Sequence, residues 1–92
     1  MTKAWTIVAT KAYLNEYNRL WVDHPEHRAA IRKLDLDLKN HRPELDLFIE
    51  RSADRLRADL WILPHSGLEI LLKLVPGDRM VTLEWIRRPS AY

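Results

Sequence analysis

Apolar and polar positions in the first 22 residues change from a strand-like to a helical rhythm. Residues 5–9 are short, apolar and β-branched, which is typical of a strand. Between residues 10 and 22, large side chains recur three or four positions apart and predict a helix. These side chains are Tyr13, Tyr17, Leu20 and Trp21. A stripe of this kind usually faces a core, so we expect the helix to pack against the rest of the domain.

A second helix is predicted from the break at residue 23 to about Asn40. Asp23 is placed to cap its first amides, Pro25 suits a first turn, and Glu26 stands where a capping-box carboxylate belongs. The apolar stripe consists of Ala30, Ile31, Leu34 and Leu38. Residues 34–38 also alternate like a strand, but the helical context before them favours a helix. The two helices would form an αα-hairpin.

The segment from residue 44 to residue 59 fits two structures. One face of a helix would hold Leu45, Phe48, Ile49 and Leu56, whereas one face of a strand would hold Leu45, Leu47 and Ile49. We expect a short helix or an irregular connection here.

Three strands are predicted in the last third of the chain, over residues 60–63, 68–75 and 79–87. Turn signals at residues 64–67 and 76–78 separate them, and Pro89 ends the last strand because proline has no amide to donate. Residues 68–75 are almost wholly apolar, which indicates a central strand with a neighbour on each side. Simple alternation in the last strand places Val81, Leu83 and Trp85 on one face and Ile86 on the other.

The predicted fold class is therefore α+β, in one domain over residues 1–92. It has an N-terminal strand, a helical hairpin and a three-stranded antiparallel meander. The helices should cover one face of the sheet. Arg79, Arg87 and Arg88 would lie near the open face or at its end.

Composition narrows the classes of function. The chain has no cysteine, which excludes disulfides, thiolate zinc sites and cysteine nucleophiles and fits the cytoplasm. No run approaches 18 apolar residues, and the N-terminus lacks the apolar stretch of a secretory signal, so no membrane partner is expected. The net charge of +2 is too small to indicate nucleic-acid binding by itself. Most of the four tryptophans should be core, and one or two on the sheet face would mark a binding surface.

The element order and the chain length resemble the RelE/ParE superfamily of bacterial type II toxins. The most specific stretch is residues 60–75, and residues 81–88 look like the family's last strand and basic tail. The resemblance covers nearly the whole chain in architecture, while its motifs match only in the last third. It implies a β-α-α-β-β-β fold and the toxin role of a toxin–antitoxin module, with an antitoxin protein as partner.

Two targets implied by the resemblance stay open. Ribosome-dependent mRNA cleavage would make the chain an endoribonuclease, in which Arg87 or Arg88 and Tyr92 have counterparts among the family's catalytic residues. Residues 60–63 carry no lysine where family nucleases do, and Glu69 stands where they carry an arginine. ParE-like members inhibit DNA gyrase without these residues, so gyrase is the second target. A homodimer is also left open.

The candidate site residues have chemistry that suits RNA. Arg87 and Arg88 could hold a phosphate through their planar guanidinium groups, and Tyr92 could stack on a base. His65, expected on an exposed turn, could act as an acid or base near neutral pH. His24 and His27 match no standard zinc spacing, so no metal and no cofactor are expected.

Two other classes of function fit the same residues. A non-catalytic interaction module would be harmless when expressed without its partner. A small basic RNA-binding protein would bind RNA with an affinity that depends on salt and on Arg87 and Arg88.

Overall fold

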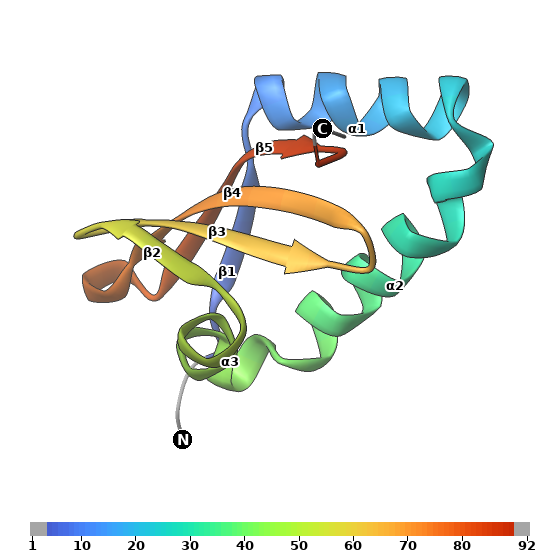
Figure 1. Ribbon diagram of the computed structural model, residues 1–92. Helices are drawn as coiled ribbons and strands as arrows, with labels where there is room; N and C mark the ends of the chain where they lie inside the picture. The colour runs from blue at the N-terminus through green and yellow to red at the C-terminus, as the bar shows by residue number, and fades with distance from the viewer. Residues whose placement is uncertain (1–3, 90–92) are drawn as a thin grey trace.

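A five-stranded sheet with helices along one side makes up the computed structural model, which describes residues 4–89 (Figure 1). The strands are β1 (Thr6–Ala9), β2 (Asp54–Arg57), β3 (Leu60–His65), β4 (Leu68–Val75) and β5 (Met80–Arg87), in the order β1-β5-β4-β3-β2. β1 runs parallel to β5, and the other pairs are antiparallel. The predicted α+β class and the central position of β4 are confirmed.

The predicted helical pair is present as α1 (Lys11–Asp23) and α2 (Arg28–Asn40), joined by a 3₁₀ turn over Pro25–His27. The predicted side-chain caps of the second helix are wrong, because no side chain makes a cap hydrogen bond at the start of either the turn or α2. Asp23 instead belongs to α1, whose last turn closes when His24 N–H donates to the Leu20 carbonyl at 3.0 Å. No helix within residues 4–89 has the length and apolar character needed to cross a membrane.

The ambiguous segment forms a short helix, α3 (Leu45–Ser52), and then the edge strand β2. The helix is one of the two alternatives expected, but β2 was not expected. All four side chains of β2 are exposed, so the strand has no alternation of buried and exposed positions that a sequence could reveal. Backbone pairing with β3 is what makes it a strand.

One apolar core joins the helices to a single face of the sheet. The apolar stripe of α2 is buried as predicted, with Ile31 and Leu34 fully inaccessible. On the sheet, buried side chains alternate with outward ones along β4 and β5. The buried sheet residues are Leu63, Leu68, Ile70, Leu72, Leu74, Val81, Leu83 and Ile86. Each helix contributes to the same cluster.

A β-bulge in β5 reverses the predicted faces of its last residues. Leu72 pairs with Leu83 and Leu71 pairs with Trp85, which leaves Glu84 without a partner in β4. Because one extra residue shifts the alternation by one position, Ile86 joins the core and Trp85 turns outward, 40% exposed. Simple alternation was therefore correct for Val81 and Leu83 and wrong for the two residues after Glu84.

Thr10 connects this bulge to the start of α1. Its hydroxyl donates to the Glu84 carbonyl at 3.1 Å and accepts from the Tyr13 amide at 3.1 Å as the helix N-cap. The Thr10 amide also donates to the Leu83 carbonyl at 3.0 Å. One side chain thus satisfies the carbonyl of the unpaired bulge residue and a free amide of the first turn of α1.

A two-residue turn at Ser66 and Gly67 links β3 to β4. Both residues have positive φ, 53° and 84°, as the tight hairpin turn that matches strand twist requires. The predicted four-residue turn was too long, because Pro64 and His65 still pair with Glu69 and Leu68 across the ladder.

Replacing Thr10 with alanine should lower the free energy of unfolding by about 1–2 kcal/mol, because a helix cap and the bond to the bulge are lost together. Thr10→Ser keeps the hydroxyl and serves as the matched control. Urea denaturation followed by circular dichroism measures both variants. Equal stability of the alanine and serine variants would contradict the role assigned to the hydroxyl.

Tyr17 and Asp35 connect α1 to α2. The phenol donates to Asp35 Oδ2 at 2.6 Å, and burial together with this bond raises the pKa of Tyr17 from 10.0 to about 12. The folded state therefore favours the neutral phenol, and its contribution to stability is fully present below pH 10 and is lost as the pH rises towards about 12.

We expect the free energy of unfolding to fall between pH 10 and pH 12, and to fall less steeply in Tyr17→Phe because that phenol can no longer ionise. Buried Tyr13, whose pKa is raised chiefly by its burial, contributes in the same direction and remains in the variant. Denaturation at a series of pH values tests this, and identical slopes for the two proteins would contradict it.

Candidate active site

A cleft of about 600 Å³ opens where the end of α1 approaches the end of β5. Glu16, Arg19 and Leu20 line it from α1. His24 and His27 line it from the corner between α1 and α2, and Gly67 does so from the β3–β4 turn. The remaining lining comes from Trp85, Arg87, Arg88 and Pro89. Residues far apart in the sequence thus place cations, imidazoles and one indole around a single cleft.

The bulge and the N-cap of α1 bring these elements together. Thr10 holds the start of α1 against Glu84, so α1 runs from the bulge towards the end of β5. Thirteen residues of helix extend about 20 Å, which places the corner at His24 beside the last residues of the strand. The exposed face of Trp85 is available there only because the bulge has turned this side chain away from the core.

The two predicted arginines lie in the cleft with different surroundings. Arg87 is the cross-strand partner of Glu69, and its Nε donates to Glu69 Oε1 at 3.1 Å. Arg88 follows the strand, is exposed, and forms no hydrogen bond or ion pair with the described part of the chain. Arg79, predicted near the same region, lies at the opposite end of β5 with its guanidinium over Trp5.

Glu69 therefore has a partner inside the protein. Its carboxylate balances the charge of Arg87, so it adds less repulsion towards a phosphate than an unpaired carboxylate would. The outward face of β3 is apolar as the sequence indicated, with Leu60 and Ile62 half-buried.

His65 does not stand on an exposed turn as predicted. It is the last residue of β3, its side chain is 10% exposed, and Nε2 lies 2.6 Å from Asp37 Oδ2 on α2. Its Nδ1 is buried without a partner among the described residues. The longer strand explains the difference, since pairing with Leu68 keeps His65 in the ladder and directs its ring towards α2. His65 is not among the residues that line the cleft.

Tyr92 lies outside the described residues. The sequence did not assign four of the residues that line the cleft to the site: Arg19, His24, His27 and Trp85. The spacing of the two histidines was noticeable, but nothing in it indicated that they approach the C-terminal arginines. Within residues 4–89, no three histidine or acidic side chains are arranged to hold a metal ion.

The bond between His65 and Asp37 should stabilise the packing of α2 on β3. We expect His65→Ala to lower the free energy of unfolding by about 1–3 kcal/mol, since a partly buried, charge-assisted bond is lost. A double-mutant cycle with Asp37→Ala isolates the pair and should give a coupling energy of about 1 kcal/mol. Fully additive effects would show that the two side chains do not interact.

No protein-family model and no curated protein matches the sequence of this chain. Comparison of structures does find similar proteins. A chain of the RelBE2 toxin–antitoxin complex from Mycobacterium tuberculosis matches with a TM-score of 0.67 and 16% identity, covering 95% of this chain and 100% of that chain. A chain of the intact RelBE toxin–antitoxin complex from E. coli matches with a TM-score of 0.64 and 17% identity. The match covers 96% of this chain and 100% of that chain.

A third match is a doubly substituted E. coli RelE toxin in complex with a peptide of the antitoxin RelBc. Its TM-score is 0.58 at 20% identity, over 97% of this chain and 87% of that chain. At these identities the likeness concerns the backbone, and it extends over nearly the whole chain in all three cases. The chain has a RelE-like toxin fold, which confirms the resemblance drawn from the sequence at the level of the fold.

Proposed function

We propose that this chain is the toxin of a type II toxin–antitoxin module and that it acts by cleaving RNA in the cleft between α1 and β5. The observation that carries the proposal is the meeting of Arg19, Arg87 and Arg88 with two histidines in one cleft of a RelE-like fold. Cations to hold a phosphate and groups that transfer protons near neutral pH are what RNA cleavage needs.

Single-stranded RNA is the nucleic acid that suits the lining best. Trp85 offers an exposed indole on which an unpaired base can stack, next to arginines that can contact the neighbouring phosphate. Arg88 is the principal phosphate ligand in this proposal, because Arg87 already shares its Nε with Glu69. Tyr92 follows four residues after Arg88 in the sequence and is proposed as a second stacking residue.

An antitoxin protein is the partner in this proposal. Each of the three similar structures is a complex of a toxin with an antitoxin. Exposed apolar side chains on the helices of this chain, among them Val22 at 68% and Leu36 at 56%, are surface that such a partner would cover. We place the protein in the cytoplasm, where a toxin of this kind meets its targets.

One observation favours DNA gyrase as a second candidate target. The outward face of β3 carries Leu60 and Ile62 where a nuclease of the resembled family would carry lysines. This apolar surface is better suited to contact with a protein than with a phosphate backbone.

Induced expression in a bacterial host tests the proposal. We expect growth to stop, protein synthesis to fall before DNA synthesis, and growth to recover when a cognate antitoxin is expressed with the chain. Arg88→Ala should relieve the arrest, because the principal phosphate contact is lost. Arg51→Ala, an exposed arginine at the end of α3 and outside the cleft, is the matched control and should leave the arrest intact.

The outcomes separate the candidate functions. Normal growth with the intact protein present at high level would overturn the toxin role. Arrest in which DNA synthesis stops first would replace RNA with gyrase as the target. Arrest that persists in Arg88→Ala would show that the cleft is not where RNA is held.

A further inference from the structure

His24 and His27 are held at the corner of the helical pair by the backbone. His24 ends α1 through its amide bond to Leu20, and the His27 amide donates to the His24 carbonyl at 2.9 Å. Their ring centroids lie 6.2 Å apart at an interplanar angle of 57°. The side chains are 27% and 22% exposed, so each ring is partly enclosed yet accessible from the cleft.

Glu26 lies between the two rings and contacts both with one oxygen. Its Oε1 is 3.2 Å from His24 Nδ1 and 4.0 Å from His27 Nε2. Bonding to its own backbone amide, with further help from His24 and His27, lowers the pKa of Glu26, so the side chain is a carboxylate at neutral pH. These contacts leave Nε2 of His24 and Nδ1 of His27 for a substrate.

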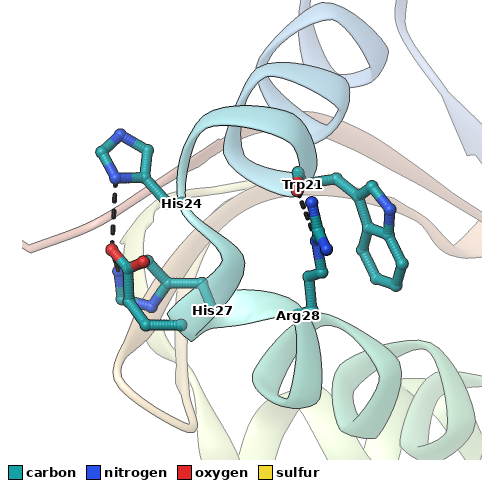
Figure 2. Close-up of polar contacts among 5 residues, drawn as sticks. Trp21, His24, His27 and Arg28 are labelled. Atoms are coloured by element: carbon teal, nitrogen blue, oxygen red, sulfur yellow. Dashed lines mark hydrogen bonds and ion pairs between the residues drawn. The ribbon is translucent and has the colours of Figure 1, made fainter.

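The corner that carries the histidines is braced from the opposite side. Arg28 Nε donates to the Trp21 carbonyl at 2.7 Å, and its guanidinium lies 5.4 Å from the centre of the Trp21 ring. Arg32 lies over the same ring at 5.2 Å. Figure 2 shows Trp21 and Arg28 on one side of the chain and the two histidines on the other. The brace ties α2 to the end of α1 and so fixes the position of both imidazoles.

The charged groups around the histidines leave one arginine, Arg88, to bind a phosphodiester. Arg19 from α1 and Arg87 and Arg88 from β5 line the same cleft, against a single lining carboxylate, Glu16. Glu16 bonds Arg19 on its own helix, and Glu69 bonds Arg87. The other charged groups at the corner are Glu26 and Asp23. Four carboxylates therefore offset three arginines, and Arg88, which forms no hydrogen bond or ion pair with the described part of the chain, is the cation left to attract an anionic group to the histidines.

We infer that His24 and His27 form the acid–base pair of a ribonuclease site, with single-stranded RNA as substrate and Glu26 as the positioning residue. This inference rests on the proposed function and assigns its proton-transfer groups. One neutral imidazole removes the proton of a ribose 2′-hydroxyl while the 2′-oxygen forms a bond to phosphorus. The bond from phosphorus to the 5′-oxygen breaks, and the protonated second imidazole gives its proton to that oxygen.

The products are a 2′,3′-cyclic phosphate and a 5′-hydroxyl end, and the two histidines have exchanged protonation states. Proton exchange with water restores them, so the step needs no other reactant. Guanidinium groups of Arg87 and Arg88 stabilise the charge that grows on the phosphate oxygens. A chain that lacks the 2′-hydroxyl at the cleaved position cannot react, so DNA is not a substrate.

Cleavage by the purified full-length chain tests the pair. The probe is a reporter mRNA carrying a 5′ label, offered alone and on translating ribosomes, and the new ends are analysed for the cyclic phosphate. His24→Gln and His27→Gln should each lower the rate at least ~100-fold. His41→Gln is the matched control, because His41 stacks on Phe48 away from the cleft, and it should cleave at the wild-type rate.

Four further readouts distinguish catalysis from folding. Circular dichroism and binding of an RNA with a 2′-deoxy sugar at the cleaved position should be unchanged in both glutamine variants. Free imidazole should restore part of the activity of His24→Ala and His27→Ala. Glu26→Gln should lower kcat with little change in KM, as a positioning residue requires.

The outcomes separate the two proposals. If the wild-type chain leaves RNA intact, both when the RNA is alone and when it is on translating ribosomes, the proposed RNA cleavage and the proposed histidine pair are both overturned. If the wild-type chain cleaves and both glutamine variants cleave at a similar rate, the proposed function stands and the histidine pair is overturned. The pair is also overturned if the variants lose binding of the 2′-deoxy RNA in proportion to the loss of rate.

Discussion

The bond from the Thr10 hydroxyl to the Glu84 carbonyl is the interaction on which the rest of the site depends. A bulge interrupts the β4–β5 ladder at Glu84 and leaves backbone groups that need partners. The residue that meets one of them is the N-cap of α1, so the helix begins at the bulge. The direction of α1 and the faces of the last β5 residues are therefore set at one place.

Two consequences of this constraint meet at the far end of α1. The bulge turns Trp85 out of the core and aligns Arg87 with Glu69, while α1 extends to the corner that holds the histidines. The cleft is thus enclosed by secondary-structure elements and by a braced turn rather than by long loops. A site built in this way holds its side chains at nearly fixed positions. This favours proton transfer between groups that lie within hydrogen-bonding distance of each other.

The polar groups of this chain lie elsewhere than the resemblance drawn from its sequence led us to expect. β3 carries apolar residues instead of the expected lysines, and the cations of the cleft are Arg19 on α1, Arg87 at the end of β5 and Arg88 after it. The backbone is similar to RelE-like toxins over nearly its whole length at 16–20% identity. Similar backbones can therefore carry different polar groups, and the chemistry has to be argued from the side chains of this chain.

The sequence could predict elements whose burial leaves a periodic pattern. The sequence predicted α2 because one face of that helix, around Ile31 and Leu34, is buried in the core. It predicted β4 because this strand is almost wholly apolar and contributes buried side chains to the same core. Strand β2 was missed because none of its side chains is buried. His65 was misplaced because turn-forming residues near it hid the two additional residues of β3.

By itself the sequence determined the α+β class, the order of most elements, the central strand and the positions of Arg87 and Arg88 at the end of the last strand. Local periodicity and turn chemistry are enough for these features, because they act over a few neighbouring residues. Only the tertiary structure decided that Trp85 faces outward and that His24 and His27 join the arginines. A bulge and the direction of a helix arise from contacts between residues more than 70 positions apart, such as Thr10 and Glu84, and no local pattern records them.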